Sequence, residues 1–459
     1  MPLADLAAPP VAVADAADLI DRLDQAFSGG FARLGEAHLD ALDALQRAFA
    51  GTPLAPALSA AVEGITRSEF LDRHFLVLAA ARAALQGAQH DALVAQASAA
   101  LGRPAPKLEA VPAGGGQAAP PQHGVWLESA RHWLMELALA GFGNLGTDTL
   151  LPFQATLDPI ESDGRLPRHA TLLGGFLDEL LSVFPAQGTP AIPLFRWADL
   201  WSRAMVLSAA APPPAATRPA TGELRLLGAD LRQHDTFATL VAFGVLREPG
   251  KEPRLVRATV SAFKVDVIQG EELGALFDDA GGKLLDALAG FRALSITDMP
   301  LAATNDLHWH DGKAKLGAPF DAMAEAAAAL GAAPEHRPCL EPADRHPALI
   351  EELVYLAGYD VAGDELTLAL GGAALPIAHD RWPETDDLGP ADLKGSAALV
   401  GLLRFDGGRW SLQPLAVNKK KPPLRAVGSS LGAARGKKSK LGALPTLKER
   451  ASKLLRKKS

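Results

Sequence analysis

The chain has 459 residues, which leaves room for two to four domains, and its 48% hydrophobic and 21% charged residues are typical of a globular protein. Cys339 is the only cysteine, which excludes a disulfide within the chain and a zinc site of the usual thiolate kind. No apolar run approaches the roughly 18 residues of a membrane span, and the first residues lack the basic and apolar regions of a secretory signal. We therefore expect a cytoplasmic protein.

The net charge of −8 combines two segments of opposite sign. Residues 418–459 contain 14 Lys and Arg against one acid, Glu449, and the rest of the chain contains 31 basic and 52 acidic residues. A body of that sign repels nucleic acid and anionic membranes, whereas the tail attracts both. The body and the tail also attract each other.

The first 210 residues are predicted to be helical. Apolar residues recur at three- and four-residue spacing, which predicts a helical bundle over 1–102 and a second helical block over 123–210. The core of the second block is expected to be aromatic, built from Trp126, Trp133, Phe142, Phe153, Phe176, Phe184, Phe195, Trp197 and Trp201. Proline-rich runs at 103–122 and 211–221 are interpreted as linkers.

From residue 222 the apolar period changes to two, which indicates strands. Strand-like runs lie at 222–233, 237–248 and 254–268, and PGKEP at 249–253 predicts a hairpin turn between the last two.

Strand patterns resume at 364–377 and 396–417, after short helices expected around 282–291 and 321–331. Asp406-Gly407 lies between two apolar runs and predicts a second hairpin. Residues 222–417 are thus predicted to form a barrel- or sandwich-like β domain with helical insertions. The predicted fold class is α+β and multidomain: two helical blocks, this β-rich domain and a disordered basic tail.

The tail over 418–459 carries the strongest functional signal. Its first half is too basic and glycine-rich to fold alone, and its last part, PTLKERASKLLRKK, is compatible with a short amphipathic helix. The side chains predicted to contact a partner or nucleic acid are Lys419, Lys420, Lys421, Arg435, Lys437, Lys438, Lys440, Lys453, Arg456, Lys457 and Lys458. Because the tail has no aromatic residue, its binding to nucleic acid would depend on phosphate contacts and weaken with salt.

Two glycine patterns resemble nucleotide-binding motifs. Gly141, Gly143 and Gly146 give a G-x-G-x-x-G spacing, but a helix pattern precedes it where a dinucleotide site requires a strand, so we interpret it as a helix stop and turn. Gly282-Lys283 lacks the upstream glycine of a phosphate-binding loop. No cofactor-binding residue is predicted.

His308 and His310 are the best metal-like pair. On a strand both rings point to one face, as two imidazole ligands to one ion require, and Asp306 and Asp311 flank them. Asp311-Gly312 also resembles a hairpin turn, whose polar end is a common place for a surface histidine. The alternatives are a surface position and a zinc site in a metal-dependent hydrolase.

His346 lies close in sequence to the carboxylates Glu341, Asp344, Glu351 and Glu352. Acid–base catalysis would need two of these groups in one cleft, whereas a solvated helix beginning at HPALIEEL places Glu351 and Glu352 in its first turns. We favour the helix.

Two further places carry polar residues without a predicted site. His234-Asp235 follows the first strand, and Asp406, Gly407 and Trp410 are interpreted as turn and core residues. No catalytic residue is predicted.

The end of the β-rich segment, ALPI at 374–377 and SAALVGLLRFDGGRWSLQPLAV at 396–417, resembles the C-terminal end of bacterial SWIM zinc-finger-associated proteins. The Trp-rich block followed by GELRLLGADLRQ at 222–233 resembles them more loosely, so the resemblance covers 126–417. The SWIM finger needs three cysteines and a histidine, and Cys339 alone cannot supply it, so no ligand residue is carried over.

Those proteins occur in gene neighbourhoods with MoxR-type AAA ATPases and von Willebrand factor A domain proteins. The resemblance therefore implies a bacterial scaffold or adaptor beside an ATPase. We accordingly expect a non-catalytic interaction protein that docks partners through its acidic body and basic tail. The alternatives are nucleic-acid binding through the tail and a metal-dependent hydrolase that uses His308 and His310.

Overall fold

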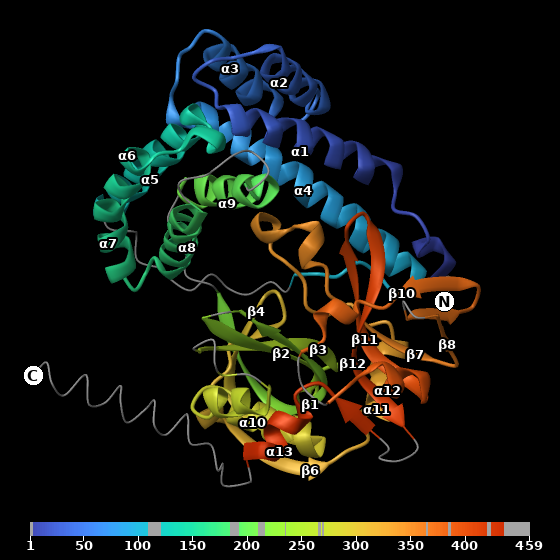
Figure 1. Ribbon diagram of the computed structural model, residues 1–459. Coiled ribbons are helices and arrows are strands. Elements are labelled where there is room, and N and C mark those ends of the chain that lie inside the picture. The colour runs from blue at the N-terminus through green and yellow to red at the C-terminus, as the bar shows by residue number, and fades with distance from the viewer. Residues whose placement is uncertain are drawn as a thin grey trace, which may run out of the picture.

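The computed structural model describes residues 3–108, 121–183, 192–209, 216–234, 236–264, 268, 270–363, 366–383, 387–419 and 424–435. Its fold is α+β, with a helical first part followed by a β-rich part (Figure 1). The predicted fold class is confirmed.

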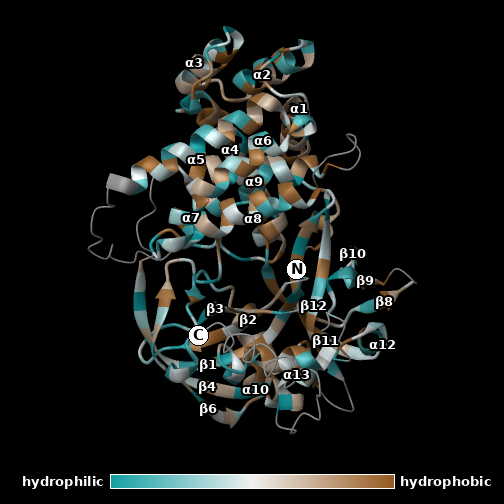
Figure 2. Ribbon diagram, turned by 60° about the vertical axis from the view of Figure 1, so that its left-hand side comes forward, coloured by the Kyte–Doolittle hydropathy of each residue, from teal (hydrophilic) through white to brown (hydrophobic). Residues whose placement is uncertain are grey.

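The helical part begins with a short 3-10 turn, η1 (Leu3–Leu6). Its α-helices are α1 (Val11–Gly29), α2 (Glu36–Ala48), α3 (Ala55–Thr66), α4 (Asp72–Ala100), α5 (Pro121–Ala140), α6 (Thr147–Leu150), α7 (Gln154–Ser162), α8 (Pro167–Val183) and α9 (Leu194–Leu207). Hydrophobic and hydrophilic residues alternate along most of these helices (Figure 2), as expected for helices that bury one face.

The two predicted helical blocks share one core. Phe27 of α1 lies 4.4 Å from Trp201 of α9 and 5.9 Å from Phe142, measured between ring centroids. Of the predicted aromatic core, Phe195 is the exception, because half of its surface is exposed. Phe184 lies outside the described residues.

Gly30 and Gly141 let the ends of α1 and α5 meet. Both residues have φ near +84°, and a Cβ on Gly30 would lie 2.6 Å from the backbone of residues 139–141. The amide N–H of Phe31 donates to the carbonyl oxygen of Ala138 across this contact, over 2.9 Å. Gly141 therefore ends α5, as the helix-stop interpretation predicts.

Strands β1 to β5 close into a barrel. They are β1 (Thr217–Gln233), β2 (Phe237–Arg247), β3 (Arg254–Phe263), β4 (Arg292–Ala302) and β5 (Asp306–Leu307). The order β1-β2-β3-β5-β4 returns to β1, because β1 pairs with both β2 and β4. Only β3 and β5 are parallel within it. This order, with a helix between β3 and β4, is that of an OB-type Greek-key barrel.

One predicted boundary beside the barrel is corrected. Thr217–Thr221, predicted as linker, belongs to β1, where Pro219 lies opposite Pro300 of β4. The helix between β3 and β4 is α10 (Gly282–Gly290), which packs Leu284, Leu285 and Leu288 into the barrel core. η5 (Gly270–Phe277) precedes it.

A second sheet packs on the outside of the barrel. Its order is β13-β12-β11-β7, from β7 (Glu352–Ala357), β11 (Ser396–Asp406), β12 (Arg409–Lys419) and β13 (Leu424–Ala426). Along β2 the inward Leu240, Ala242 and Leu246 alternate with the outward Val241, Phe243 and Val245. The outward side chains pack against Val400, Leu402 and Leu415 of the second sheet.

The remaining elements of the β-rich part complete this arrangement. They are β6 (Ala314–Pro319) beside β4, α11 (Ala322–Gly331), the small sheet of β8 (Asp360–Ala362), β9 (Thr367–Leu370) and β10 (Ala373–Pro376), and α12 (Pro390–Lys394). Short 3-10 turns include η6 (Asp311–Lys313), η7 (Pro342–Asp344) and η8 (Pro347–Leu349).

The folded body extends beyond Val417. β13 pairs with Ala416–Asn418, and α13 (Ser429–Arg435) packs on α10 with Leu431 fully buried. The start of the tail is therefore corrected from residue 418 to residue 436, because Ala426 and Leu431 reach apolar neighbours from distant parts of the chain. Residues 436–459, including the predicted amphipathic helix, lie outside the described residues.

Helix α4 joins the two parts. Phe75, Leu78 and Ala81 in its first half belong to the helical core, and Leu93 and Ala97 in its second half belong to the core of the β-rich part. A helix of 29 residues is roughly 44 Å long, which is enough to cross from one core to the other.

We expect Gly30→Ala to destabilise the protein more than Gly51→Ala. Both positions have φ above +80°, so both variants incur the left-handed backbone cost of about 1–2 kcal/mol. No atom lies within 4 Å of a Cβ at Gly51, whereas Gly30 contacts backbone, which adds about 1–3 kcal/mol. Chemical denaturation measures the difference, and equal losses would contradict the close contact.

Candidate binding cleft between the helical and β-rich parts

A cleft of about 540 Å³ lies where the helical part meets the β-rich part. We call it the interdomain cleft. It is lined by Pro9, Val13, Ala14, Ala17, Asp18, Ile20 and Asp21 at α1, Gln86 and Gln89 of α4, Phe195 of α9, His346, Pro347 and Ala348 at η8, and Phe405–Gly408 of the β11–β12 turn. A volume of this size suits a small molecule or a few side chains of a peptide, and domain interfaces commonly hold such sites.

The β11–β12 hairpin forms one wall of the cleft. Gly407 and Gly408 both have positive φ, 54° and 76°, as a two-residue turn of this type requires, so the predicted Asp-Gly hairpin is confirmed. Trp410 anchors the tip to α4, because its indole N–H donates to Oε1 of Gln96 over 2.9 Å. Its ring packs edge-on against Phe405 at 5.5 Å.

The lining residues carry negative charge. Asp18, Asp21 and Asp406 are the charged side chains among them, and we call these three the acidic rim. Asp18 pairs with Arg22 at 2.5 Å and Asp406 pairs with Arg381 at 3.1 Å, but neither arginine lines the cleft. Since Asp406 is 65% exposed and Asp18 62% exposed, these carboxylates remain accessible to a ligand.

His346 contributes a neutral ring to the cleft. Its Nδ1 accepts the backbone N–H of Ala348 over 3.0 Å, so the ring proton of the neutral form is assigned to Nε2, which lies 3.7 Å from Asp199. Burial lowers the pKa of His346 to about 4, although the nearby Asp199 carboxylate raises it. At neutral pH the cleft therefore keeps its net negative charge.

Next to the cleft, two adjacent carboxylates join the parts of the fold. We call Glu351 and Glu352 the carboxylate pair. Glu352 is the first residue of β7 and Glu351 directly precedes it, and successive side chains of an extended chain point to opposite faces. The predicted solvated helix over these residues is wrong, because both side chains are 7% exposed or less and each binds buried arginine.

Glu351 binds three arginines from three strands. Its carboxylate accepts from Arg404 of β11 and from Arg257 of β3, both over 2.9 Å, and from Arg232 of β1. Burial alone would raise the pKa of Glu351, but these three guanidinium groups lower it to about 2. Glu351 therefore stays ionised at neutral pH.

Two further acids balance the charge of this cluster. Asp230 accepts from Arg404 over 2.9 Å, and its other oxygen accepts from Gln413 over 2.7 Å. Asp306 binds Arg257 through both of its oxygens, at 2.6 and 3.0 Å. Three carboxylates thus face three guanidinium groups, an arrangement that joins the barrel to the second sheet.

Glu352 links the β-rich part to helix α4. It accepts from Nε of Arg337 over 3.0 Å, and Arg337 also donates to the Ser98 hydroxyl and to the carbonyl oxygen of Pro104. Arg103 donates to the carbonyl oxygen of Leu353 over 2.7 Å. These bonds fix the end of α4 against β7.

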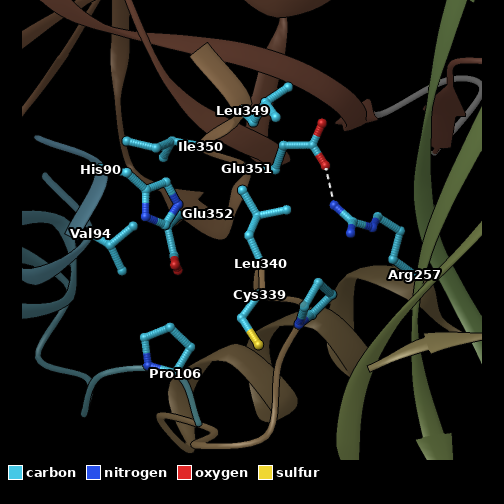
Figure 3. A pocket seen from close by; sticks show the side chains of 11 residues that line it. His90, Val94, Pro106, Arg257, Cys339, Leu340, Leu349, Ile350, Glu351 and Glu352 are labelled. Carbon is cyan, nitrogen blue, oxygen red and sulfur yellow. Dashed lines mark hydrogen bonds and ion pairs between the residues drawn. The ribbon is translucent and has the colours of Figure 1, made fainter. Parts of the chain in front are cut away.

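A small cavity of about 30 Å³ lies beside the carboxylate pair (Figure 3). His90 and Val94 of α4 line it together with Glu352, and Glu351 points toward Arg257. Cys339 also lines it, and burial raises the pKa of its thiol to about 11, so the thiol is protonated and unreactive at neutral pH. The space fits about one water molecule.

The structure separates most of the other candidate residues. His308 and His310 are both exposed, on either side of the buried Trp309, and they follow strand β5, which ends at Leu307. Within the described residues no group of three potential metal ligands forms around them or elsewhere.

Lys283, from the second glycine pattern, has internal partners: its side chain donates to backbone oxygens of Asp311 and Ala314.

The polar residues near η8 divide between surface and interface. Glu341 is exposed, and Asp344 pairs with Arg168 of α8 at 2.5 Å.

The pair His234-Asp235 follows strand β1. His234 stacks on Phe237 with ring centroids 4.3 Å apart, and its neighbour Asp235 lies outside the described residues.

Of the basic residues predicted to contact a partner, Arg435 has internal partners. It pairs with Asp278 at 2.6 Å and with Asp286 at 3.3 Å and is mostly buried. Lys419 ends β12. The other nine lie outside the described residues: Lys420, Lys421, Lys437, Lys438, Lys440, Lys453, Arg456, Lys457 and Lys458.

Comparison of the chain with models of protein families, with curated proteins and with solved structures finds no match. In the described part of the chain, no helix has the length and apolar character needed to cross a bilayer.

We expect Glu351→Gln to destabilise the protein by about 3–5 kcal/mol, because it leaves the guanidinium groups of Arg232, Arg257 and Arg404 with one carboxylate fewer. Glu341→Gln, an exposed change ten residues away, is the matched control and should alter stability by less than about 0.5 kcal/mol. Urea denaturation at pH 7 measures both. Equal effects would contradict the structural role of Glu351.

We expect His346→Asn to reduce the pH dependence of stability between pH 6.5 and 4. The folded-state pKa of His346 is depressed, so the unfolded chain binds its proton first and stability falls as pH drops through this window. Asparagine keeps an acceptor for the Ala348 N–H but does not titrate. Stability measured against pH should lose a slope equivalent to about one proton. An unchanged slope would show that His346 is protonated freely in the fold.

Proposed function

We propose that this chain is a non-catalytic interaction protein that takes a positively charged segment of a partner in its interdomain cleft. The observation that carries this proposal is the acidic rim: three carboxylates and no Lys or Arg stand among the lining residues. Apolar side chains of Val13, Ile20, Phe195 and Phe405 also line the cleft. A segment with basic and aliphatic residues would complement both.

The buried charges support a structural rather than a catalytic use of the central acids. Glu351, Asp230 and Asp306 each accept hydrogen bonds from arginine. General acid–base catalysis requires a group whose pKa lies near the working pH. The pKa of about 2 for Glu351 is far from that range.

The nature of the partner follows from the resemblance to bacterial SWIM zinc-finger-associated proteins. On that basis we propose an adaptor role in a system of a MoxR-type AAA ATPase and a von Willebrand factor A domain protein. The outer face of β2, which in OB-type barrels contributes to oligonucleotide binding, is covered by the second sheet, so this face does not favour the alternative of nucleic-acid binding.

We expect the double variant Asp18→Asn/Asp21→Asn to weaken the binding of a fluorescent peptide of Lys and Leu by about tenfold, since each lost ion pair contributes up to about 1 kcal/mol. The matched control is Asp40→Asn/Asp43→Asn on α2, which has the same spacing and the same partner arrangement, because Asp43 pairs with Arg47 as Asp18 pairs with Arg22. Fluorescence anisotropy at two salt concentrations measures binding. Equal binding by both double variants would refute the cleft as the site.

A further inference from the structure

We propose that the chain's own C-terminal segment, residues 445–459, occupies the interdomain cleft and competes there with the partner. This inference rests on the proposed function, because it takes the cleft to be a site for basic segments. It names the occupant of the cleft when no partner is bound, and it makes the tail a regulator of access.

The first argument is charge. The cleft lining has three acids and no Lys or Arg, and the described body is acidic. The segment 445–459 contains six Lys and Arg against Glu449 alone. Opposite charges on one molecule attract at the concentration that the connecting chain imposes, which for short flexible linkers is in the millimolar range.

The second argument is the apolar pattern of the segment. At helical spacing Leu447, Ala451, Leu454 and Leu455 share one face, opposite Lys448, Arg450, Lys453 and Lys457. The cleft offers the complementary arrangement. Phe195 of α9 is half exposed, and the acids lie on α1 and at the tip of the β11–β12 hairpin. An amphipathic segment in a groove is a recurrent mode of recognition.

The third argument is reach. The described chain ends at Arg435 in α13, at the end of the β-rich part away from the helices (Figures 1 and 2). Val427 hydrogen-bonds to Leu415 of β12, and from Leu415 that strand leads straight to the turn at Gly408. Summed with the rise per residue of a helix and of a strand, the path from Arg435 through Val427 and Leu415 to Gly408 in the cleft is roughly 45 Å long.

The tail is long enough for that distance. An extended chain from Arg435 to Pro445 spans up to about 33–36 Å, and a helix from Pro445 to Lys453 adds about 12 Å, which makes about 45–48 Å in all. Lys437, Lys438 and Lys440 are five or fewer residues beyond Arg435 and reach at most about 18 Å from it. These two basic groups therefore differ in access to the cleft while carrying equal charge.

That difference gives a matched pair of variants in the full chain. Lys453→Gln/Lys457→Gln/Lys458→Gln removes three charges from the segment, and Lys437→Gln/Lys438→Gln/Lys440→Gln removes three near α13. We expect the first triple variant to bind the Lys–Leu peptide about tenfold more tightly than the unmodified chain. If the tail occupies the cleft in about nine-tenths of the molecules, only about one-tenth are free to bind the peptide, so its apparent affinity is about tenfold lower. The second triple variant should bind as the unmodified chain does.

A cross-link reports the contact directly. Ala17→Cys in the cleft lining combined with Ser452→Cys should form an intramolecular disulfide under mild oxidation, and Ala17→Cys with Ser439→Cys should not. The native Cys339 does not interfere, because burial raises the pKa of its thiol to about 11.

The outcomes separate this inference from the proposed function. If both triple variants bind the peptide as the unmodified chain does and no disulfide forms at Ser452, the tail does not occupy the cleft and the inference is overturned. The proposed function then still stands if Asp18→Asn/Asp21→Asn weakens peptide binding. If that double variant binds normally, the cleft is not a site for basic segments and both proposals fail.

Discussion

The fold depends on one constraint at the start of β7, where Glu351 and Glu352 are adjacent and both buried. Neighbouring residues of a strand face opposite sides, so one partner cannot neutralise both. Glu351 is matched by arginines of β1, β3 and β11, and Glu352 by Arg337, which also holds the end of α4. The barrel, the second sheet and the helical part therefore meet at a single dipeptide.

Such an arrangement specifies geometry more than it adds stability. Removing charged groups from water is costly, and the attraction between them only offsets that cost when every group has partners. Each carboxylate of the cluster meets this condition. A purely apolar contact between the helical and β-rich parts would tolerate sliding, whereas the directional hydrogen bonds of Arg337 to Ser98 and Pro104 and of Arg103 to Leu353 fix one position.

The sequence predicts the local elements of this protein well and its central interactions poorly. Asp406-Gly407 predicts the β11–β12 hairpin because turn chemistry is local, and Gly141 predicts the end of α5 for the same reason. The partners of Glu351 lie 119, 94 and 53 residues away in sequence, so no local pattern distinguishes it from a solvated acid. The apolar residues Ile350, Val354 and Tyr355 are the local signal from which a strand over 350–356 could be predicted.

The candidate site shows the same division between local and distant information. The hairpin tip was predicted as a turn, but its position in the cleft depends on the bond between Trp410 and Gln96, 314 residues apart. Phe195 has the sequence context of a core residue, yet it lies at the boundary where α9 meets η8 and is half exposed. The segment from Leu424 to Arg435 folds because its apolar residues reach cores that composition alone does not indicate.

Helix α4 has a thermodynamic consequence for the whole molecule. Because its two halves belong to different cores, unfolding of either part would also remove the contacts that α4 makes in the core of the other part. The two parts are therefore expected to melt in one cooperative transition. A ligand that touches Gln86 and Gln89, midway along this helix, would then raise the melting temperature of the barrel as much as that of the helices.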